Sequence, residues 1–267
     1  MKVSRRTLLA APALLAMPRA LRAAETGLSP LETFLRIRCS PPETRTFWWY
    51  SGQMLARLTG EPARTMVSVI GVSHSQITRR PDGRIGYKLL EAGYYGHPDQ
   101  RGVEAIADGP IANVLTGAPM TPEHYLSPQA IIFTPELAVL PDLPTLPPGL
   151  DYTGRITPPD IKAGRVWMAE ELFVKAPPAR SAPENGPRIA NSLANFEAAL
   201  DDVTSAAEFV PATMQYTTLN SFRPWMNMGT ASGAIMMRLN AVKLPSFDAV
   251  PEDLRARILR DHPDFLA

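Results

Sequence analysis

The sequence predicts a mainly β protein, built as an antiparallel barrel-like sheet that is lipocalin-like in outline, with a short helix near each end. The first observation is a series of aromatic and β-branched runs, which favour strands. The second is the tight-turn sequence between them, as in Pro81-Asp82-Gly83-Arg84, which is typical of hairpins. Closing such a sheet removes its exposed edges, so a barrel is the economical architecture, with a β-sandwich or an α+β fold as alternatives.

The N-terminal half of the mature chain is predicted to begin with a helix and to continue as a four-strand meander. Ser29 is placed to cap that helix, over residues 28–39, and Pro30 suits its first turn. The strands are separated by short turns, so that each should pair with the next. They are predicted at residues 46–58, 65–80, 85–97 and 103–108.

A proline-rich insertion, around residues 109–159, interrupts this pattern. Proline cannot donate a hydrogen bond to a sheet, so the insertion is predicted to be mostly loop with one strand at residues 130–140. Beyond it, the expected strands are residues 164–176, 210–229 and 231–244, followed by a helix at residues 251–262.

One segment favours a helix inside this β-rich region. In residues 188–203, the apolar side chains Ile189, Leu193 and Phe196 recur every three to four residues. That period is typical of an amphipathic helix rather than of a strand. We therefore favour a helix there, with an irregular strand as the alternative.

The N-terminus has the composition of an export signal. The first 24 residues hold five basic residues and no acid, and an apolar stretch leads to a tail of small residues. Ser4-Arg5-Arg6-Thr7-Leu8-Leu9 resembles the twin-arginine motif. We predict a signal peptide at residues 1–24, cleavage near residues 20–25, and a periplasmic mature protein formed by one β-rich domain at residues 25–267.

Composition limits the classes of partner. The net charge of the whole chain is +1, and it becomes about −4 without the five basic residues of the signal, which argues against nucleic acid as the main partner. No later apolar stretch is long enough to predict a membrane span. The single cysteine, Cys39, excludes an internal disulfide, and the four histidines show no metal-ligand spacing. No metal and no cofactor are predicted.

The chain resembles a family of bacterial and fungal proteins called domain of unknown function 1838. The resemblance rests on "FWWYSGQMLARLTGE", on "GYKLLEAGYY", and above all on "SFRPWMNMG" continuing into "KLPSFDAVPEDLRARILRDHPDFL". After the second stretch, relatives carry a longer turn rich in tryptophan, asparagine and threonine, which is absent here. The resemblance implies an all-β fold and no particular reaction.

Strand alternation selects two candidates for proton transfer. In residues 85–97 it places Tyr87 and Glu91 on one face, within an aromatic row. A carboxylate there is costly unless it has a partner or a raised pKa, so Glu91 is a candidate general acid–base and Tyr87 a ligand contact. His74, the histidine best enclosed by a predicted strand, is the second candidate.

The stretch "NSFRPWMNMGTASG", residues 220–233, holds the strongest binding candidates. Alternation places Arg223, Trp225 and Asn227 in one polar row, facing away from the neighbouring methionines. Such a row suits a ligand cavity, because an arginine can hold a carboxylate through two parallel hydrogen bonds.

Two other strands add candidate ligand contacts. Glu170 and Glu171 lie on opposite faces of one strand, so whichever faces the interior is a candidate, and Glu171 is the one we select. Trp48, Trp49 and Tyr50 cannot all face inward, and Trp49 is selected from them.

Three functions remain open on the sequence alone. The first is binding of a small acidic or aromatic organic ligand in a barrel cavity. The second is a cofactor-independent isomerase, lyase or hydrolase, in which Glu91 moves protons and Arg223 polarises a carbonyl. The third is a cell-envelope protein whose proline-rich middle contacts a partner. We expect Glu91 and Arg223 to share one concave site if either of the first two is correct.

Overall fold

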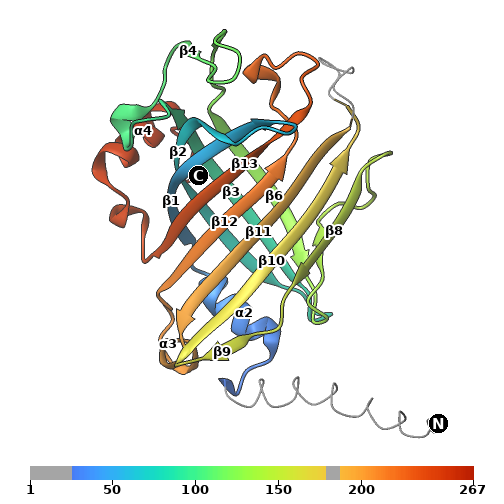
Figure 1. Cartoon of the computed structure of the whole chain (residues 1–267). Helices are drawn as coiled ribbons and strands as arrows, with labels where there is room; N and C mark the ends of the chain where they lie inside the picture. Colours follow the sequence, from blue (N-terminus) through green and yellow to red (C-terminus); the bar gives the residue numbers. More distant parts are fainter. Residues whose placement is uncertain (1–25, 179–186) are drawn as a thin grey trace, which may run out of the picture.

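The computed structural model describes residues 26–178 and 187–267, so the predicted signal peptide at residues 1–24 lies outside the described residues. The chain forms one eleven-stranded antiparallel sheet, curled into a nearly closed barrel (Figure 1). Its neighbours run in the order β7-β6-β3-β2-β1-β13-β12-β11-β10-β8, with β9 paired to β10. The predicted mainly β, barrel-like fold is confirmed.

The strands of the barrel take the following bounds. They are β1 (Thr46–Leu58), β2 (Arg64–Arg79), β3 (Ile85–Gly96), β6 (Tyr125–Phe133), β7 (Val139–Pro141), β8 (Asp151–Ile156), β9 (Asp160–Lys162), β10 (Arg165–Ala176), β11 (Arg188–Ala199), β12 (Ala212–Asn220) and β13 (Gly233–Leu244). A separate pair, β4 (Ile111–Ala112) and β5 (Pro119–Met120), forms a small hairpin. The helices are α2 (Pro30–Arg38), α3 (Leu200–Thr204) and α4 (Glu252–Asp261), with 3-10 turns η1 (Val103–Ala105), η3 (Pro224–Met226) and η4 (Phe247–Ala249).

Closure takes place between β7 and β8, the two ends of the strand order. Ala138 forms a β-bridge with Arg155, and the Ile156 N–H donates to the Leu137 carbonyl at 2.7 Å. These contacts join strands that both come from the predicted proline-rich insertion. The insertion is therefore part of the barrel wall, because its short strands complete the ring that the longer strands begin.

Helix α2 closes the lower end of the barrel in Figure 1. The Ser29 hydroxyl accepts the Glu32 N–H at 3.2 Å, as the sequence predicts for the cap. Phe34 is fully buried and meets Phe133 and Phe196 edge-on, at centroid distances of 5.3 and 5.6 Å. This aromatic cluster fills the closed end, which we call the inner end.

The C-terminal segment packs on the outside of the barrel. Leu254 and Ile258 of α4 and Phe265 beyond it are fully buried against Val72 of β2 and Tyr94 of β3. Their apolar side chains form a second cluster, separate from the core inside the barrel. The outer face of β1 to β3 is thus covered, and the inner face remains free to line an interior.

Several expectations about secondary structure were wrong, and two of them concern which segments pair in the sheet. Residues 188–199 form strand β11 rather than a helix, and only the short α3 follows it. The predicted fourth strand of the meander, at residues 103–108, is the 3-10 turn η1, and β3 pairs instead with β6. In both places sheet pairing with distant segments outweighs the local pattern.

We predict that Phe34→Ala lowers the free energy of unfolding by about 3–5 kcal/mol, because it leaves a cavity in the aromatic cluster. Urea unfolding followed by circular dichroism measures this. Phe173→Ala is the matched control, since Phe173 is 36% exposed on β10 and its loss should cost roughly 1 kcal/mol or less. Equal losses in the two variants would show that α2 contributes little to the core.

Candidate functional site

The barrel encloses a cavity of about 470 Å³. That volume is typical of sites for small organic molecules. Aliphatic side chains and tyrosine rings from several strands make up most of its wall. The aliphatic members are Leu89, Leu172, Val174, Met214, Met237 and Leu239, and the tyrosines are Tyr50, Tyr95, Tyr125 and Tyr216.

Small side chains on β11 make room for this cavity. Ala190, Ser192 and Ala194 line it from alternate positions of the strand. The bulkier Ile189 and Leu193 occupy the other face, and Ile189 is 38% exposed there. The apolar spacing that favours a helix in the sequence therefore combines Ile189 and Leu193 of the outer face with Phe196, which is buried on the inner face.

Glu91 of β3 lies in this cavity beside two tyrosine hydroxyls. The Tyr125 hydroxyl donates to Glu91 Oε1 at 3.3 Å, and the Tyr50 and Tyr125 hydroxyls are 3.0 Å apart. The three side chains come from β1, β3 and β6. Together they form a chain of hydrogen-bonding groups that ends at a carboxyl.

Two glycines allow the tyrosines to meet. Tyr50, Gly71, Gly93 and Tyr125 are consecutive partners across β1, β2, β3 and β6. A Cβ at Gly71 would lie 2.2 Å from the Tyr50 hydroxyl, and one at Gly93 would lie 2.1 Å from Cζ of Tyr125. The rings thus lie across the glycines, and any larger residue there would push the hydroxyls apart.

The environment of Glu91 favours its protonated form. Removal from water raises the pKa of the Glu91 carboxyl, while hydrogen bonds from Tyr50 and Tyr125 and the charges of Arg38 and Arg223 oppose that rise without cancelling it. Such a carboxyl keeps a proton above the pH at which an ordinary glutamate loses it. It can therefore donate or accept a proton at a higher pH than an ordinary glutamate can.

Arg223 lies at the open end of the barrel, which we call the mouth, and lines the same cavity as Glu91. Its guanidinium makes no hydrogen bond or ion pair with any other residue in the part of the chain that the structure describes. It influences the pKa of Glu91, Tyr95 and Tyr216 through its charge. The expected convergence of Glu91 and Arg223 on one concave site is thus present.

Arg223 lies after the end of a strand, and not within one as the sequence had predicted. Strand β12 ends at Asn220, and Pro224 begins the turn η3, so alternation does not extend across this stretch. Trp225 is buried at the mouth, with its ring 5.2 Å from that of Tyr95. Asn227 adopts a left-handed conformation, is exposed, and donates to the Pro119 carbonyl at 3.2 Å, so it does not follow Arg223 into the cavity.

On β10, the glutamate that lines the cavity is not the one that we selected. Glu170 lines the cavity, whereas Glu171 points outward and pairs with Arg155 at 2.6 Å. Glu170 lies 3.6 Å from Arg38, the last residue of α2, which also lines the cavity. Tyr87 is buried beneath that guanidinium, with Arg38 Cζ 5.0 Å from its ring centre.

Two candidates lie on the outer face of the barrel. Trp48 and Tyr50 are buried on the inner face, so alternation turns Trp49 outward, where it packs on the cluster under the C-terminal segment. His74 also faces outward, and its Nε2 lies 2.6 Å from the Phe265 carbonyl. Their positions fit a role in holding the C-terminal segment rather than contact with the cavity.

Arg38 and the hydroxyls of Tyr50 and Tyr125 were not among the predicted site residues. The signal for Arg38 was a basic residue in an otherwise buried last turn of a helix, which becomes meaningful only when that helix is known to enter the barrel. The signal for the tyrosines was Gly93 within an aromatic strand.

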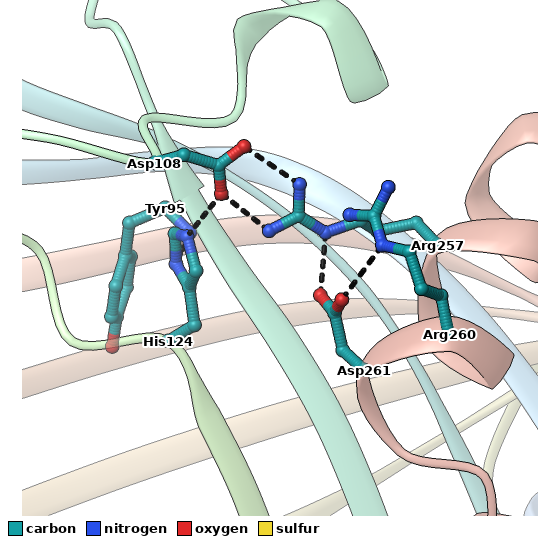
Figure 2. Close-up of polar contacts among 6 residues, drawn as sticks. All are labelled: Tyr95, Asp108, His124, Arg257, Arg260 and Asp261. Carbon is teal, nitrogen blue, oxygen red and sulfur yellow. Dashed lines mark hydrogen bonds and ion pairs between the residues drawn. The ribbon is translucent and has the colours of Figure 1, made fainter.

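A network at the mouth connects the cavity to α4 (Figure 2). The Tyr95 backbone N–H donates to Nδ1 of His124 at 3.2 Å, so a neutral ring carries its hydrogen on Nε2, which faces Asp108 at 3.8 Å. Arg257 of α4 donates to Asp108 at 2.8 Å, and burial together with the charge of Arg257 lowers the pKa of His124. The network fixes the wall that carries Tyr95.

The described residues contain no group of three or more histidine, cysteine, aspartate or glutamate side chains arranged to hold a metal ion. Within the same residues, every helix is too short or too polar to cross a membrane. The cavity wall carries three carboxyls, two guanidiniums, one imidazole and several phenols.

We predict that Glu91→Gln changes how stability depends on pH. Because the folded state holds the Glu91 proton more tightly than the unfolded state, whose pKa is near 4.5, wild-type stability falls as pH rises from that value through the raised pKa. The variant lacks this loss, so its melting temperature relative to wild type should increase as the pH rises above about 4.5. Thermal unfolding at several pH values tests this, with Glu171→Gln as the outer-face control. A difference that stays constant with pH would contradict the assignment.

Comparison with known proteins identifies a family for the C-terminal part of the chain. Residues 187–267 match the family described as "Protein of unknown function (DUF1838)". This range includes Arg223 and α4 and excludes the two earlier stretches of the resemblance. No curated protein and no solved structure matches the chain. The match over residues 187–267 supports the resemblance to the domain of unknown function 1838 family.

Proposed function

We propose that the protein binds a small organic acid in the barrel cavity, with the carboxylate at Arg223. The observation that carries this is the position of Arg223, which lines a mainly apolar cavity and has no partner among the described residues. A guanidinium matches a carboxylate in shape and charge, because two parallel N–H groups can bind both of its oxygens.

The wall of the cavity supports an apolar or aromatic body for this ligand. Leu89, Met214 and Leu239 offer aliphatic surface, while Tyr95 and Trp225 place aromatic rings at the mouth. Burying the apolar part of a ligand there gains about 25 cal/mol for each Å² removed from water. Arg223 then fixes its orientation, with the carboxylate toward the mouth.

We also propose that binding takes place in the periplasm after export through the twin-arginine pathway. The support is the sequence Ser4-Arg5-Arg6-Thr7-Leu8-Leu9 and the apolar stretch after it. A ligand that diffuses freely into that compartment would fit a protein with an accessible cavity.

We predict that Arg223→Met weakens the binding of medium-chain carboxylates such as octanoate by at least about tenfold, since a charge-assisted hydrogen bond is lost. Isothermal titration calorimetry measures the affinity, with octanol as the neutral comparison. Arg238→Met is the matched control, because Arg238 alternates with the cavity residues Met237 and Leu239 and therefore points outward. Octanol binding as tightly as octanoate would overturn the proposal.

A second candidate function is proton transfer on a bound carbonyl compound. The observation that favours it is the chain from Tyr50 through Tyr125 to Glu91, which ends in the same cavity as Arg223. In this scheme the Glu91 carboxylate takes a proton from the carbon next to a carbonyl, and Arg223 stabilises the negative charge that develops on oxygen. The proton then returns from Glu91 to the same or a neighbouring carbon.

We predict that such proton transfer is detectable as deuterium uptake. An α-keto acid incubated with the protein in heavy water should exchange its carbon-bound hydrogens, and Glu91→Gln should slow this by at least about a hundredfold. Nuclear magnetic resonance follows the exchange, with Glu171→Gln as the control. Wild-type exchange no faster than in buffer, despite binding, would leave the protein as a binder without this activity.

A further inference from the structure

The inner end of the cavity contains an ion pair whose partners do not form a hydrogen bond. Arg38 and Glu170 are both buried, yet their nearest atoms, Nε and Oε2, are 3.6 Å apart. That distance is too long for a hydrogen bond. The exposed pairs Arg155–Glu171 and Arg165–Glu197, by contrast, approach to 2.6 and 2.8 Å.

Burial makes this arrangement costly. Nε of Arg38 and Oε2 of Glu170 have no hydrogen-bond partner among the described residues. The same is true of the Tyr152 hydroxyl, whose pKa is raised by burial and by the charge of Glu170. A buried ion pair offsets its loss of hydration only when its geometry is good and its remaining polar atoms are satisfied. The two unsatisfied atoms of Arg38 and Glu170, both on the cavity wall, therefore indicate a site for polar atoms supplied from outside the chain.

Aromatic rings hold Arg38 in place without using its N–H groups. Its guanidinium carbon lies 5.0 Å from the ring centres of both Tyr87 and Phe196. Stacking on rings restrains a guanidinium by its faces and leaves the N–H groups along its edge available. Helix α2 thus presents a fixed donor edge at the closed end of the cavity.

Charge decides what this edge binds. Burial raises the pKa of the Glu170 carboxyl, and the charge of Arg38, 3.6 Å away, opposes that rise. In its ionised form Glu170 compensates the charge of Arg38, so a second carboxylate would face Glu170 as well as Arg38 and would be repelled by it. A neutral group that both donates and accepts can satisfy both partners, accepting from Arg38 and donating to Glu170.

We infer that Arg38 and Glu170 form a second polar subsite at the inner end of the cavity, which binds a neutral hydroxyl or carboxamide group of the ligand. This rests on the proposed binding of a carboxylate at Arg223. The ligand class is then an organic acid with an apolar middle and a neutral hydrogen-bonding group at the far end. Met214, Leu172 and Leu239 line the space between the two ends.

The test compares ligands of matched chain length. Straight-chain carboxylates from hexanoate to dodecanoate are titrated beside their ω-hydroxy and α,ω-dicarboxylate counterparts, at about pH 8, into the mature protein. The ω-hydroxyl should tighten binding by at least about tenfold at the chain lengths that reach Arg38, because it gains hydrogen bonds to charged groups. The dicarboxylate of the same length should bind more weakly than the hydroxy acid.

Glu170→Gln tests the charge argument directly. It leaves Arg38 uncompensated, so the preference should reverse and the dicarboxylate should bind at least about tenfold more tightly than the hydroxy acid. Glu171→Gln, one residue away and on the outer face, should keep the wild-type order. Circular dichroism and melting temperature establish that each variant is folded.

The outcomes separate the two proposals. If no straight-chain carboxylate binds the wild-type protein, the proposed function fails and this inference fails with it. If carboxylates bind and Arg223→Met weakens them, but the ω-hydroxyl gives no gain at any length, only the inner subsite is overturned. The wild-type comparison decides this even if Glu170→Gln does not fold.

Discussion

The packing of α2 into one end of the barrel is the interaction on which the rest of the structure depends. Phe34 completes the aromatic cluster at the inner end, and Arg38, one turn later, carries a guanidinium into the cavity. Lys243 of β13 secures the end of this helix by donating to the Arg36 and Cys39 carbonyls. The element that closes the core therefore also sets the charge inside it.

Side-chain volume explains why this barrel is hollow. Along β11, the inward positions are mostly small, as at Ala190, Ser192 and Ala194, while the outward positions include Ile189 and Leu193. A strand that faces a filled core shows the reverse pattern, since burial favours the larger apolar side chains. The predicted helix was wrong because Ile189 and Leu193 on the outer face and Phe196 on the inner face together imitate a helical spacing.

The inner face of β3 could be predicted because alternation is reliable within a long, continuous strand. Tyr87 and Glu91 lie inside, as the period of two requires. Alternation failed for Asn227, because Pro224 ends the strand pattern and begins a turn. It could not choose between Glu170 and Glu171 either, since both faces of β10 carry apolar side chains and only the closed barrel defines an inside.

Contacts between segments that are distant in the chain could not be predicted from the sequence. Arg38 meets Glu170 only because a helix enters the barrel, and the Tyr50 hydroxyl meets that of Tyr125 only because two glycines stand between them across the sheet. His74 illustrates the opposite case. It was a candidate for proton transfer because it is a histidine within a strand. The C-terminal segment covers the outer face there, however, and the Phe265 carbonyl contacts the His74 ring.

The electrostatics of the cavity favour a ligand with one negative charge. Glu170 compensates Arg38, and the removal of Glu91 from water favours its neutral form, which leaves Arg223 as the guanidinium without a partner on the described cavity wall. Glu123 also lines the mouth and, like Arg223, is exposed, so water screens the charges of both side chains there. A ligand that ionised Glu91 would add a second negative charge to the cavity, and Arg38 and Arg223 both lie close enough to stabilise it. The same two arginines that would orient an organic acid would therefore also favour the ionised Glu91 that a proton-transfer reaction requires.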